Sequence, residues 1–242
     1  MKHGIMTFQK ALLQWFTEDA RDLPWRRTKD PYRVYLSEIM LQQTRVDQGL
    51  PYYERFLKKF PTLDALAKAT EEEVLKAWEG LGYYTRARNM HRTARTVVEE
   101  YEGRFPDAPE VLQLLPGIGK YTAGAIASIA FNKAVPVLDG NVKRVLARLD
   151  ALDMSIDIPA TETLLWQRAA ALVPAKSPGD FNQAMMELGA RICTPRTPLC
   201  EACPVQKHCD AYSQNKQQAL PVRTPKKAVP HHEVVIAAIE KD

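Results

Sequence analysis

The chain has 242 residues, of which 45% are hydrophobic, 26% charged and 8% aromatic, and its formal net charge is +4. This composition excludes an intrinsically disordered chain, and no apolar run approaches the roughly 20 residues that a membrane span requires. Because the N-terminus also lacks a signal-peptide apolar region, the sequence predicts an intracellular protein without a membrane partner, and its mild basic excess permits a polyanionic one.

Apolar residues at helical spacing predict an all-α fold. The expected helices, in chain order, span residues 8–16, 32–46, 51–60, 62–67, 70–78, 84–101, 110–115, 120–131, 141–149, 162–172 and 181–191. Thr70 and Glu73 have the spacing of a capping box, which predicts the start of the helix that follows. The Gln-, Lys- and Pro-rich segment 213–230 is typical of a linker, and the only strand signal is the apolar run at 233–239.

Four cysteines, the only ones in the chain, lie in one short segment with the spacing C-x6-C-x2-C-x5-C. Disulfides are disfavoured because two bridges within so short a loop would constrain little of the chain. Zinc remains possible, with His208 as an alternative ligand, although only one C-x2-C pair is present. Four thiolates in one loop favour an iron–sulfur cluster held by Cys193, Cys200, Cys203 and Cys209.

The segment 115–122, with the sequence LPGIGKYT, predicts two short helices joined by a tight turn. The glycines Gly117 and Gly119 allow a positive φ and leave backbone N–H groups uncovered beside a helix N-terminus. Such a hairpin can bind phosphate without reading sequence. The alternative is a plain helix–turn–helix whose glycines serve close packing.

Two carboxyl groups stand out from the rest. Glu38 lies within a predicted helix beside apolar neighbours, which would raise its pKa, as a general acid requires; the alternative is a solvated glutamate paired with Arg45. Asp139 precedes a predicted helix, where a simple N-cap is the alternative, and the helix N-terminus would keep it ionised. Two carboxyls with pKa values driven apart are typical of glycosidic-bond cleavage.

In their order along the chain, Glu38, the hairpin, Asp139 and the cysteine loop resemble the endonuclease III-like superfamily of helix-hairpin-helix DNA glycosylases. The resemblance extends over roughly residues 8–230 and is greatest to the adenine-excising branch of that superfamily. The motifs that carry it are LPWR at 23–26, SEIMLQQT at 37–44, GLGYY at 80–84, LDGNV at 138–142 and FNQAMM at 181–186.

This resemblance implies a two-domain, all-α fold with a cleft between the domains. A six-helix bundle containing the hairpin would span 25–132, and an iron–sulfur cluster domain would combine 1–24 with 133–212. Residues 213–230 would be a linker, and 231–242 the first strand of a β-rich, Nudix-like C-terminal domain that is otherwise missing. The cofactor would be a [4Fe–4S] cluster on the four cysteines with a structural role, its loop presenting Arg196 and Lys207 to phosphates.

The resemblance also implies the partner and the chemistry. The partner would be double-stranded DNA with adenine opposite 8-oxoguanine or guanine, and the adenine would be flipped into the cleft. Glu38 would protonate the base, Asp139 would stabilise or attack the sugar cation, and Tyr121 would orient the pair. The expected base contacts are Arg26 and Gln183, and the expected DNA contacts are Gln43, Thr44, Tyr83, Gly117, Gly119, Lys120 and Asn141. Among the latter, Gln43 and Tyr83 would wedge into the base stack and Thr44 would approach the 8-oxoguanine.

One departure from the wider superfamily concerns strand cleavage. Bifunctional relatives carry a Schiff-base lysine where this chain has Tyr121, and Lys120 is one residue too early and should face another side of its helix, which predicts a monofunctional enzyme. Nothing in the sequence suggests more than a monomer. A tyrosine here also occurs in thymine-specific mismatch glycosylases, which are therefore the alternative among enzymes. Outside enzymes, the alternative is a non-catalytic iron–sulfur DNA-binding protein. A cytoplasmic location at the bacterial nucleoid is expected.

Overall fold

The computed structural model describes residues 2–225, and within them the chain is helical with no strand. The predicted strand at 233–239 lies outside the described residues. One group of elements comprises η1 (Pro24–Arg26), α2 (Pro31–Met40), α3 (Val46–Lys59), α4 (Leu63–Lys68), α5 (Glu71–Trp78), α6 (Thr85–Glu100), α7 (Pro109–Leu112) and α8 (Lys120–Ile129). The other comprises α1 (Lys2–Asp19), α9 (Gly140–Leu149), α10 (Pro159–Leu172), α11 (Pro178–Arg191), η2 (Cys200–Ala202), η3 (Gln206–His208) and α12 (Asp210–Ser213).

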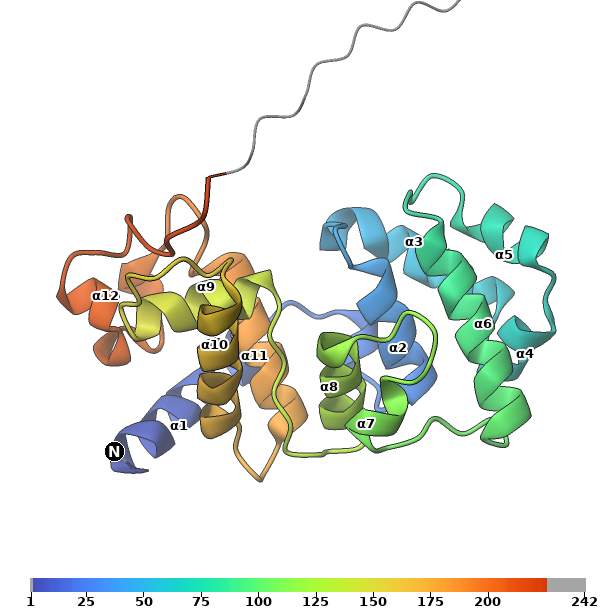
Figure 1. Cartoon of the computed structure of the whole chain (residues 1–242), viewed down its shortest axis with the longest axis horizontal. Coiled ribbons are helices and arrows are strands. Elements are labelled where there is room, and N and C mark those ends of the chain that lie inside the picture. Colours follow the sequence, from blue (N-terminus) through green and yellow to red (C-terminus); the bar gives the residue numbers. More distant parts are fainter. Residues whose placement is uncertain (1, 226–242) are drawn as a thin grey trace, which may run out of the picture.

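These two groups lie side by side along the longest axis of the molecule (Figure 1). In the first group α6 packs against α4 and α5, and α2 packs against α8. In the second, α1 and α9 both pack against α11, so the N-terminal helix joins the C-terminal part of the chain. Helix α8 also contacts α11, which connects the two groups.

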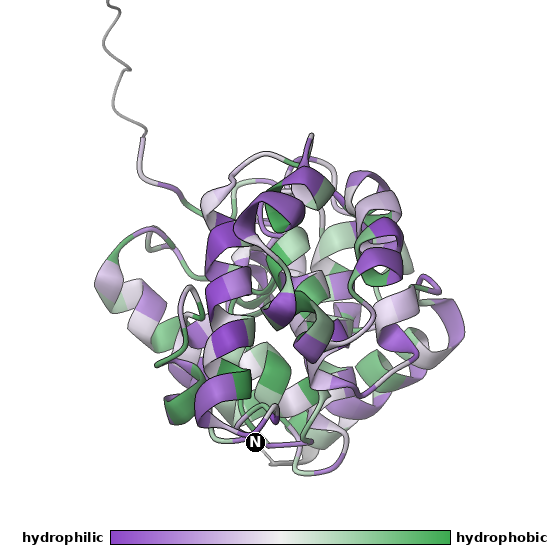
Figure 2. Ribbon diagram, turned by 90° about the vertical axis from the view of Figure 1, so that its right-hand side faces the viewer, coloured by the Kyte–Doolittle hydropathy of each residue, from purple (hydrophilic) through white to green (hydrophobic). Residues whose placement is uncertain are grey.

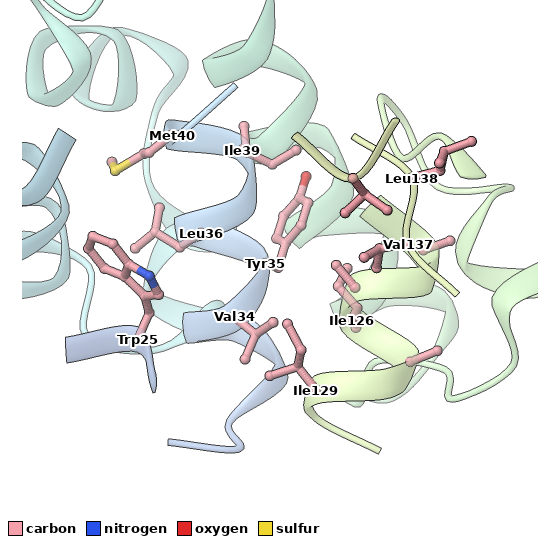
Figure 3. Close-up of a cluster of buried hydrophobic side chains, with 14 of the residues drawn as sticks. Trp25, Val34, Tyr35, Leu36, Ile39, Met40, Ile126, Ile129, Val137 and Leu138 are labelled. Carbon is pink, nitrogen blue, oxygen red and sulfur yellow. The ribbon is translucent and has the colours of Figure 1, made fainter. Parts of the chain in front are cut away.

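Helices α2 and α8 of the first group meet along an apolar face. Val34, Tyr35 and Ile39 of α2 point toward Ile126 and Ile129 of α8 (Figure 3), and all five are buried. Hydrophilic residues form stripes along the helices, as burial of one helix face requires (Figure 2). Burying each large side chain contributes roughly 1.5–3 kcal/mol, so this contact fixes α2 firmly against α8.

The structure divides the helix expected over 32–46. Helix α2 ends at Met40, a turn follows in which Gln43 has a φ of 57°, and α3 begins at Val46 with Pro51 inside it. Arg86 of α6 donates hydrogen bonds to the carbonyls of Ile39, Met40 and Gln42. In a continuing helix these carbonyls would accept from N–H groups of the helix itself. The prediction was wrong because this competitor lies more than forty residues away in sequence.

The capping box at the start of α5 is confirmed. The Thr70 hydroxyl accepts from the Glu73 N–H at 3.2 Å, and the Glu73 carboxylate accepts from the Thr70 N–H at 2.8 Å. This short pattern is readable from sequence because both partners lie within one turn.

Three glycines let backbones approach closely: Gly124 and Gly179 where α8 meets the following loop and α11, and Gly189 where α11 meets α9. A methyl group added at Gly124 of α8 would lie 2.4 Å from the Pro136 carbonyl oxygen. On α11, a methyl at Gly179 would lie 2.6 Å from the Ser128 carbonyl oxygen, and one at Gly189 would lie 2.6 Å from the Asn141 Cβ. Since real Cβ atoms do not approach so closely, these positions exclude any side chain.

The described part of the segment 213–230 lies against the loop that precedes α10. The Ile156 N–H donates to the Val222 carbonyl at 3.0 Å, Leu220 is buried, and Arg223 forms an ion pair with Asp157. Among the described helices, none combines the length and hydropathy that crossing a membrane would require.

Candidate active site and cysteine loop

A cavity of about 580 Å³ lies between the two groups of helices. This volume is within the range of small-molecule sites and is large enough for a nucleobase. Eight of the predicted site residues line it: Glu38, Asp139, Tyr121, Arg26, Gln183, Gln43, Thr44 and Asn141. The other predicted DNA contacts, Tyr83, Gly117, Gly119 and Lys120, do not line it and are exposed elsewhere.

Glu38 sits on the cavity wall at the end of α2, next to Tyr121 of α8. The Tyr121 hydroxyl donates to Glu38 Oε2 at 2.5 Å and also lies 3.2 Å from the Met186 sulfur. Burial raises the pKa of Glu38 to about 7, and the nearby Asp139 charge adds to that rise against the opposing effect of the tyrosine hydrogen bond. Burial also raises the pKa of Tyr121 well above its usual value, so its hydroxyl stays a donor.

Asp139 is the N-cap of α9 and faces the same cavity. Its carboxylate accepts from the Val142 N–H at 2.7 Å and from Asn141 Nδ2 at 2.9 Å. Burial nevertheless raises the pKa of Asp139, which these hydrogen bonds only partly oppose. The pKa of both carboxyls therefore rises, because both are removed from water, and the predicted separation of the two values stays a prediction.

A third carboxylate in the cavity was not predicted. Glu187 of α11, buried, accepts from Arg21 at 2.6 Å and from Arg26 at 2.7 Å. Burial alone would raise its pKa, but the two arginines outweigh that effect and hold the pKa of Glu187 at about 2. Arg26 also donates to the Arg21 carbonyl at 3.0 Å, so the guanidinium has a fixed position at the cavity wall.

Gln183 lies one turn before Glu187 on α11, so both face the cavity. Its neighbour Asn182 is buried and donates to Ser128 Oγ at 2.9 Å and to the Val135 carbonyl at 2.8 Å. These two bonds cross from α11 to α8 and to the loop after it, and they fix the helix turn that carries Gln183.

The hairpin lies outside the cavity, at the start of α8. Gly117 has a φ of 75°, a conformation that residues with a Cβ rarely adopt. Gly119 is the N-cap of α8. Lys120 directs its ammonium over the Trp166 ring of α10 at 4.1 Å. This lysine points away from the candidate site, in agreement with the expectation that it faces another side of its helix.

The four cysteines line one shared cavity and form no disulfide. Within residues 2–225, no group of three or more His, Cys, Asp or Glu side chains is gathered around a point where a single metal ion would sit. Buried Arg148 donates to the Cys193 sulfur at 3.2 Å and to the Thr194 carbonyl at 2.7 Å. Thiols spread around one cavity, with a cation beside them, fit a multi-iron cluster better than one zinc ion.

A chain of hydrogen bonds connects the cysteine loop to the candidate site. Arg144 donates to the Cys193 carbonyl at 2.7 Å and to Asn141 Oδ1 at 2.8 Å. Asn141 in turn donates to Asp139, so one arginine positions both the loop backbone and the partner of a cavity carboxylate.

The chain matches two family models. Residues 36–171 match that of the HhH-GPD superfamily of base excision DNA repair proteins, and residues 193–209 match that of the iron–sulfur binding domain of endonuclease III. The second match covers all four cysteines and confirms the predicted iron–sulfur site.

Curated relatives and solved structures resemble the chain over most of its length. It is 49% identical to the adenine DNA glycosylase of Rattus norvegicus and 48% identical to that of Homo sapiens, over 90% and 89% of this chain and 44% and 41% of theirs. It thus spans less than half of either relative. The structure of a thermostable thymine-DNA glycosylase superposes with a TM-score of 0.79 at 33% identity, covering 88% of this chain and 98% of that one. A non-covalent endonuclease III–DNA complex has a TM-score of 0.72 at 22% identity, covering 89% and 98%, which supports the predicted fold.

Proposed function

The chain belongs to the HhH-GPD superfamily of base excision DNA repair proteins, and from this membership we propose that it removes adenine mispaired with 8-oxoguanine or guanine in duplex DNA. One observation carries the proposal: Glu38, with a pKa of about 7, faces the same cavity as Asp139, and this cavity is large enough for a nucleobase. Adenine DNA glycosylases at 48–49% identity over about nine-tenths of the chain favour adenine as the base.

Cleavage of the N-glycosidic bond follows from these two carboxyls. Protonated Glu38 gives its proton to N7 of the flipped adenine, so the bonding electrons leave with a neutral base. Asp139 faces the positive charge that develops on the sugar. Water then adds to the anomeric carbon, and the Glu38 carboxylate accepts the proton that the water loses. With Tyr121 as a hydrogen-bond donor and no lysine in its place, the reaction stops at the abasic site.

Base recognition rests on Arg26 and Gln183 in this proposal. Arg26 is held by Glu187, and Gln183 projects from the preceding turn of α11, so both polar groups are positioned before the base arrives. A site with fixed hydrogen-bonding groups rejects bases that leave them unpaired.

The proposed DNA contacts lie both on the cavity wall (Gln43, Thr44 and Asn141) and outside the cavity (Tyr83, Gly117, Gly119 and Lys120). Gln43 and Tyr83 enter the base stack beside the opposite base, which Thr44 approaches, and this offsets part of the unpairing cost of a few kcal/mol. The hairpin residues Gly117, Gly119 and Lys120 contact the backbone phosphates, and Asn141 completes the DNA contacts.

The domain division proposed with this function assigns 25–132 to the helical bundle and 1–24 with 133–212 to the cluster domain. Cys193, Cys200, Cys203 and Cys209 hold the iron–sulfur cluster, which cross-links the loop and does no redox chemistry in base release. Exposed Arg196 and Lys207 of this loop are then available to phosphates. The enzyme acts as a monomer, and we place it in the cytoplasm at the nucleoid.

Single-turnover base release tests the function. Four duplexes would carry adenine opposite 8-oxoguanine, adenine opposite guanine, thymine opposite guanine and adenine opposite thymine. We expect adenine release from the first two only, and none from an Asp139→Asn control that still binds DNA. Thymine release alone would instead identify a thymine glycosylase, the alternative that the 33% identical thymine-DNA glycosylase favours. Binding without release from any duplex would reject both.

A further inference from the structure

Two loops carry the residues that the proposed function assigns as wedges. Gln43 lies in the loop between α2 and α3, and Tyr83 lies in the loop between α5 and α6. Both adopt a left-handed backbone, with φ of 57° and 50°, although neither is a glycine. Such a conformation is uncommon for residues with a Cβ, so something outside each loop must hold it.

Arg86, in the first turn of α6, holds both loops through its guanidinium. Its Nη1 donates hydrogen bonds to carbonyls of the first loop and of the end of α2 before it. Its Nη2 donates to carbonyls of the second loop. The acceptors are Ile39 at 3.0 Å, Met40 at 3.1 Å, Gln42 at 2.5 Å, Leu81 at 3.3 Å and Gly82 at 3.2 Å. The guanidinium carbon also lies 5.3 Å from the ring centroids of Trp78 and Tyr83.

Arg86 is half-buried, and its guanidinium is directed at protein carbonyls, which distinguishes it from a phosphate-binding arginine. Its Nε is buried and without a hydrogen-bond partner, and burial lowers the pKa of its guanidinium. Arg88, two residues later on α6, is exposed and forms an ion pair with Glu71 at 3.0 Å. Arg86 and Arg88 thus lie two positions apart on one helix, and of these two only Arg86 joins the loops.

We propose that Arg86 is a positioning residue that holds Gln43 and Tyr83 together in the conformation that separates a paired base from its stack. This inference rests on the proposed function. A wedge must be rigid to push against stacked bases, because a loose loop would have to be ordered at the moment of insertion. Lysine cannot replace the arginine, since a single ammonium cannot span acceptors on two loops as a planar guanidinium does.

The test separates base extrusion from chemistry. Arg86→Gln and Arg86→Lys would be compared with Arg88→Gln on two duplexes, one with adenine opposite 8-oxoguanine and one with adenine opposite a stable abasic analogue. For Arg86→Gln we expect the single-turnover rate to fall about thirtyfold on the paired duplex and less than about threefold on the unpaired one, where extrusion costs less. Arg86→Lys should be intermediate, and Arg88→Gln should stay within about twofold of wild type.

A fluorescence measurement tests the same inference without base release. With 2-aminopurine next to the target adenine, binding by the wild type should raise fluorescence as the stack opens, and Arg86→Gln should show less than half of that rise at saturating protein. An undiminished rise, or equal rate losses on the two duplexes, would overturn the inference. If Arg86→Gln does not fold, the same two comparisons on Arg86→Lys decide. Failure of the wild type to release adenine, with its fluorescence rise intact, would reject the proposed function alone.

Discussion

The candidate site contains two glutamates that differ in one respect. Glu38 and Glu187 line the same cavity, yet the pKa of Glu38 is raised to about 7 and that of Glu187 is lowered to about 2. Both are removed from water, but Glu38 has a tyrosine hydroxyl as its neighbour while Glu187 has two guanidinium groups. The partners, and not burial alone, decide whether a carboxyl in this cavity holds a proton or a charge.

The two glutamates also have opposite effects on how the free energy of unfolding depends on pH. Because the pKa of Glu38 is above its ordinary value of 4.5, its contribution to the free energy of unfolding falls as the pH rises from about 4.5 to about 7. Glu187 has a lowered pKa, so its contribution is present above pH 4.5 and is lost as the pH falls toward about 2. Above pH 7, ionisation of Glu38 therefore lowers the free energy of unfolding, whereas ionisation of Glu187 raises it.

Removing the proton of Glu38 should have the largest effect. Glu38→Gln keeps the size of the side chain but cannot act as an acid, so the single-turnover rate should fall by about a thousandfold. The same change should leave DNA affinity intact and raise the free energy of unfolding at pH 8 by about 1 kcal/mol, because it removes a costly buried charge. A rate within tenfold of wild type would mean that another group protonates the base.

The pH dependence of base release should report the same proton. Since the protonated form of Glu38 is the active one and its pKa is about 7, the rate should be highest below pH 7 and fall about tenfold per unit above it. The measurement is the single-turnover rate from pH 5.5 to 9 at saturating enzyme. A rate that instead rises through pH 7 would assign the carboxylate, and not the acid, as the active form.

Breaking the second glutamate should affect both stability and base recognition. Glu187→Gln leaves Arg21 and Arg26 without their shared counter-charge, and we expect a loss of about 2–3 kcal/mol in the free energy of unfolding. Base release should slow by about tenfold, because Arg26 is no longer held at the cavity wall. Asp22→Asn is the matched control: its ion pair with Arg27 is exposed, so its removal should leave the free energy of unfolding almost unchanged. Equal losses in the two variants would contradict the buried-network account.

The smallest effect is expected from Tyr121→Phe. The Tyr121 hydroxyl lowers the pKa of Glu38, so its removal should move the pH midpoint of base release upward while slowing release by about fivefold. Tyr32→Phe removes another buried tyrosine hydroxyl bond, to the Phe60 carbonyl, and should change stability without moving that midpoint. An unchanged midpoint in Tyr121→Phe would show that this hydroxyl does not tune Glu38.

The sequence predicted what depends on neighbouring residues. The all-α class, the capping box at Thr70 and the cysteine loop are each encoded within a short window, and the structure or the comparisons confirm them. The end of α2 at Met40 could not be read in this way, since the carbonyls that would have continued the helix bind Arg86.

The sequence also did not predict the role of Glu187 in the candidate site, again because its partners are distant in sequence. Glu187 and Arg26 are separated by 161 positions, so no periodicity indicates their contact. The only local signal was a charged residue on the apolar side of α11, one turn after Gln183. The N-cap position of Asp139 could be read from the sequence, but the rise in its pKa could not, because an N-cap pattern does not reveal how deeply the cap is buried.

The glycine contacts at Gly124, Gly179 and Gly189 have a consequence for how the sequence can change over time. They join α8 to the chain around Pro136, and α11 to both α8 and α9, through backbone atoms that cannot be compressed or repacked. The separation between Tyr121 on α8 and Asp139 at the start of α9 is therefore insulated from substitutions elsewhere in the core. Substitutions at apolar core positions should therefore be tolerated, because they leave the separation of Tyr121 and Asp139 unchanged. Substitutions at any of the three glycines should be removed by selection.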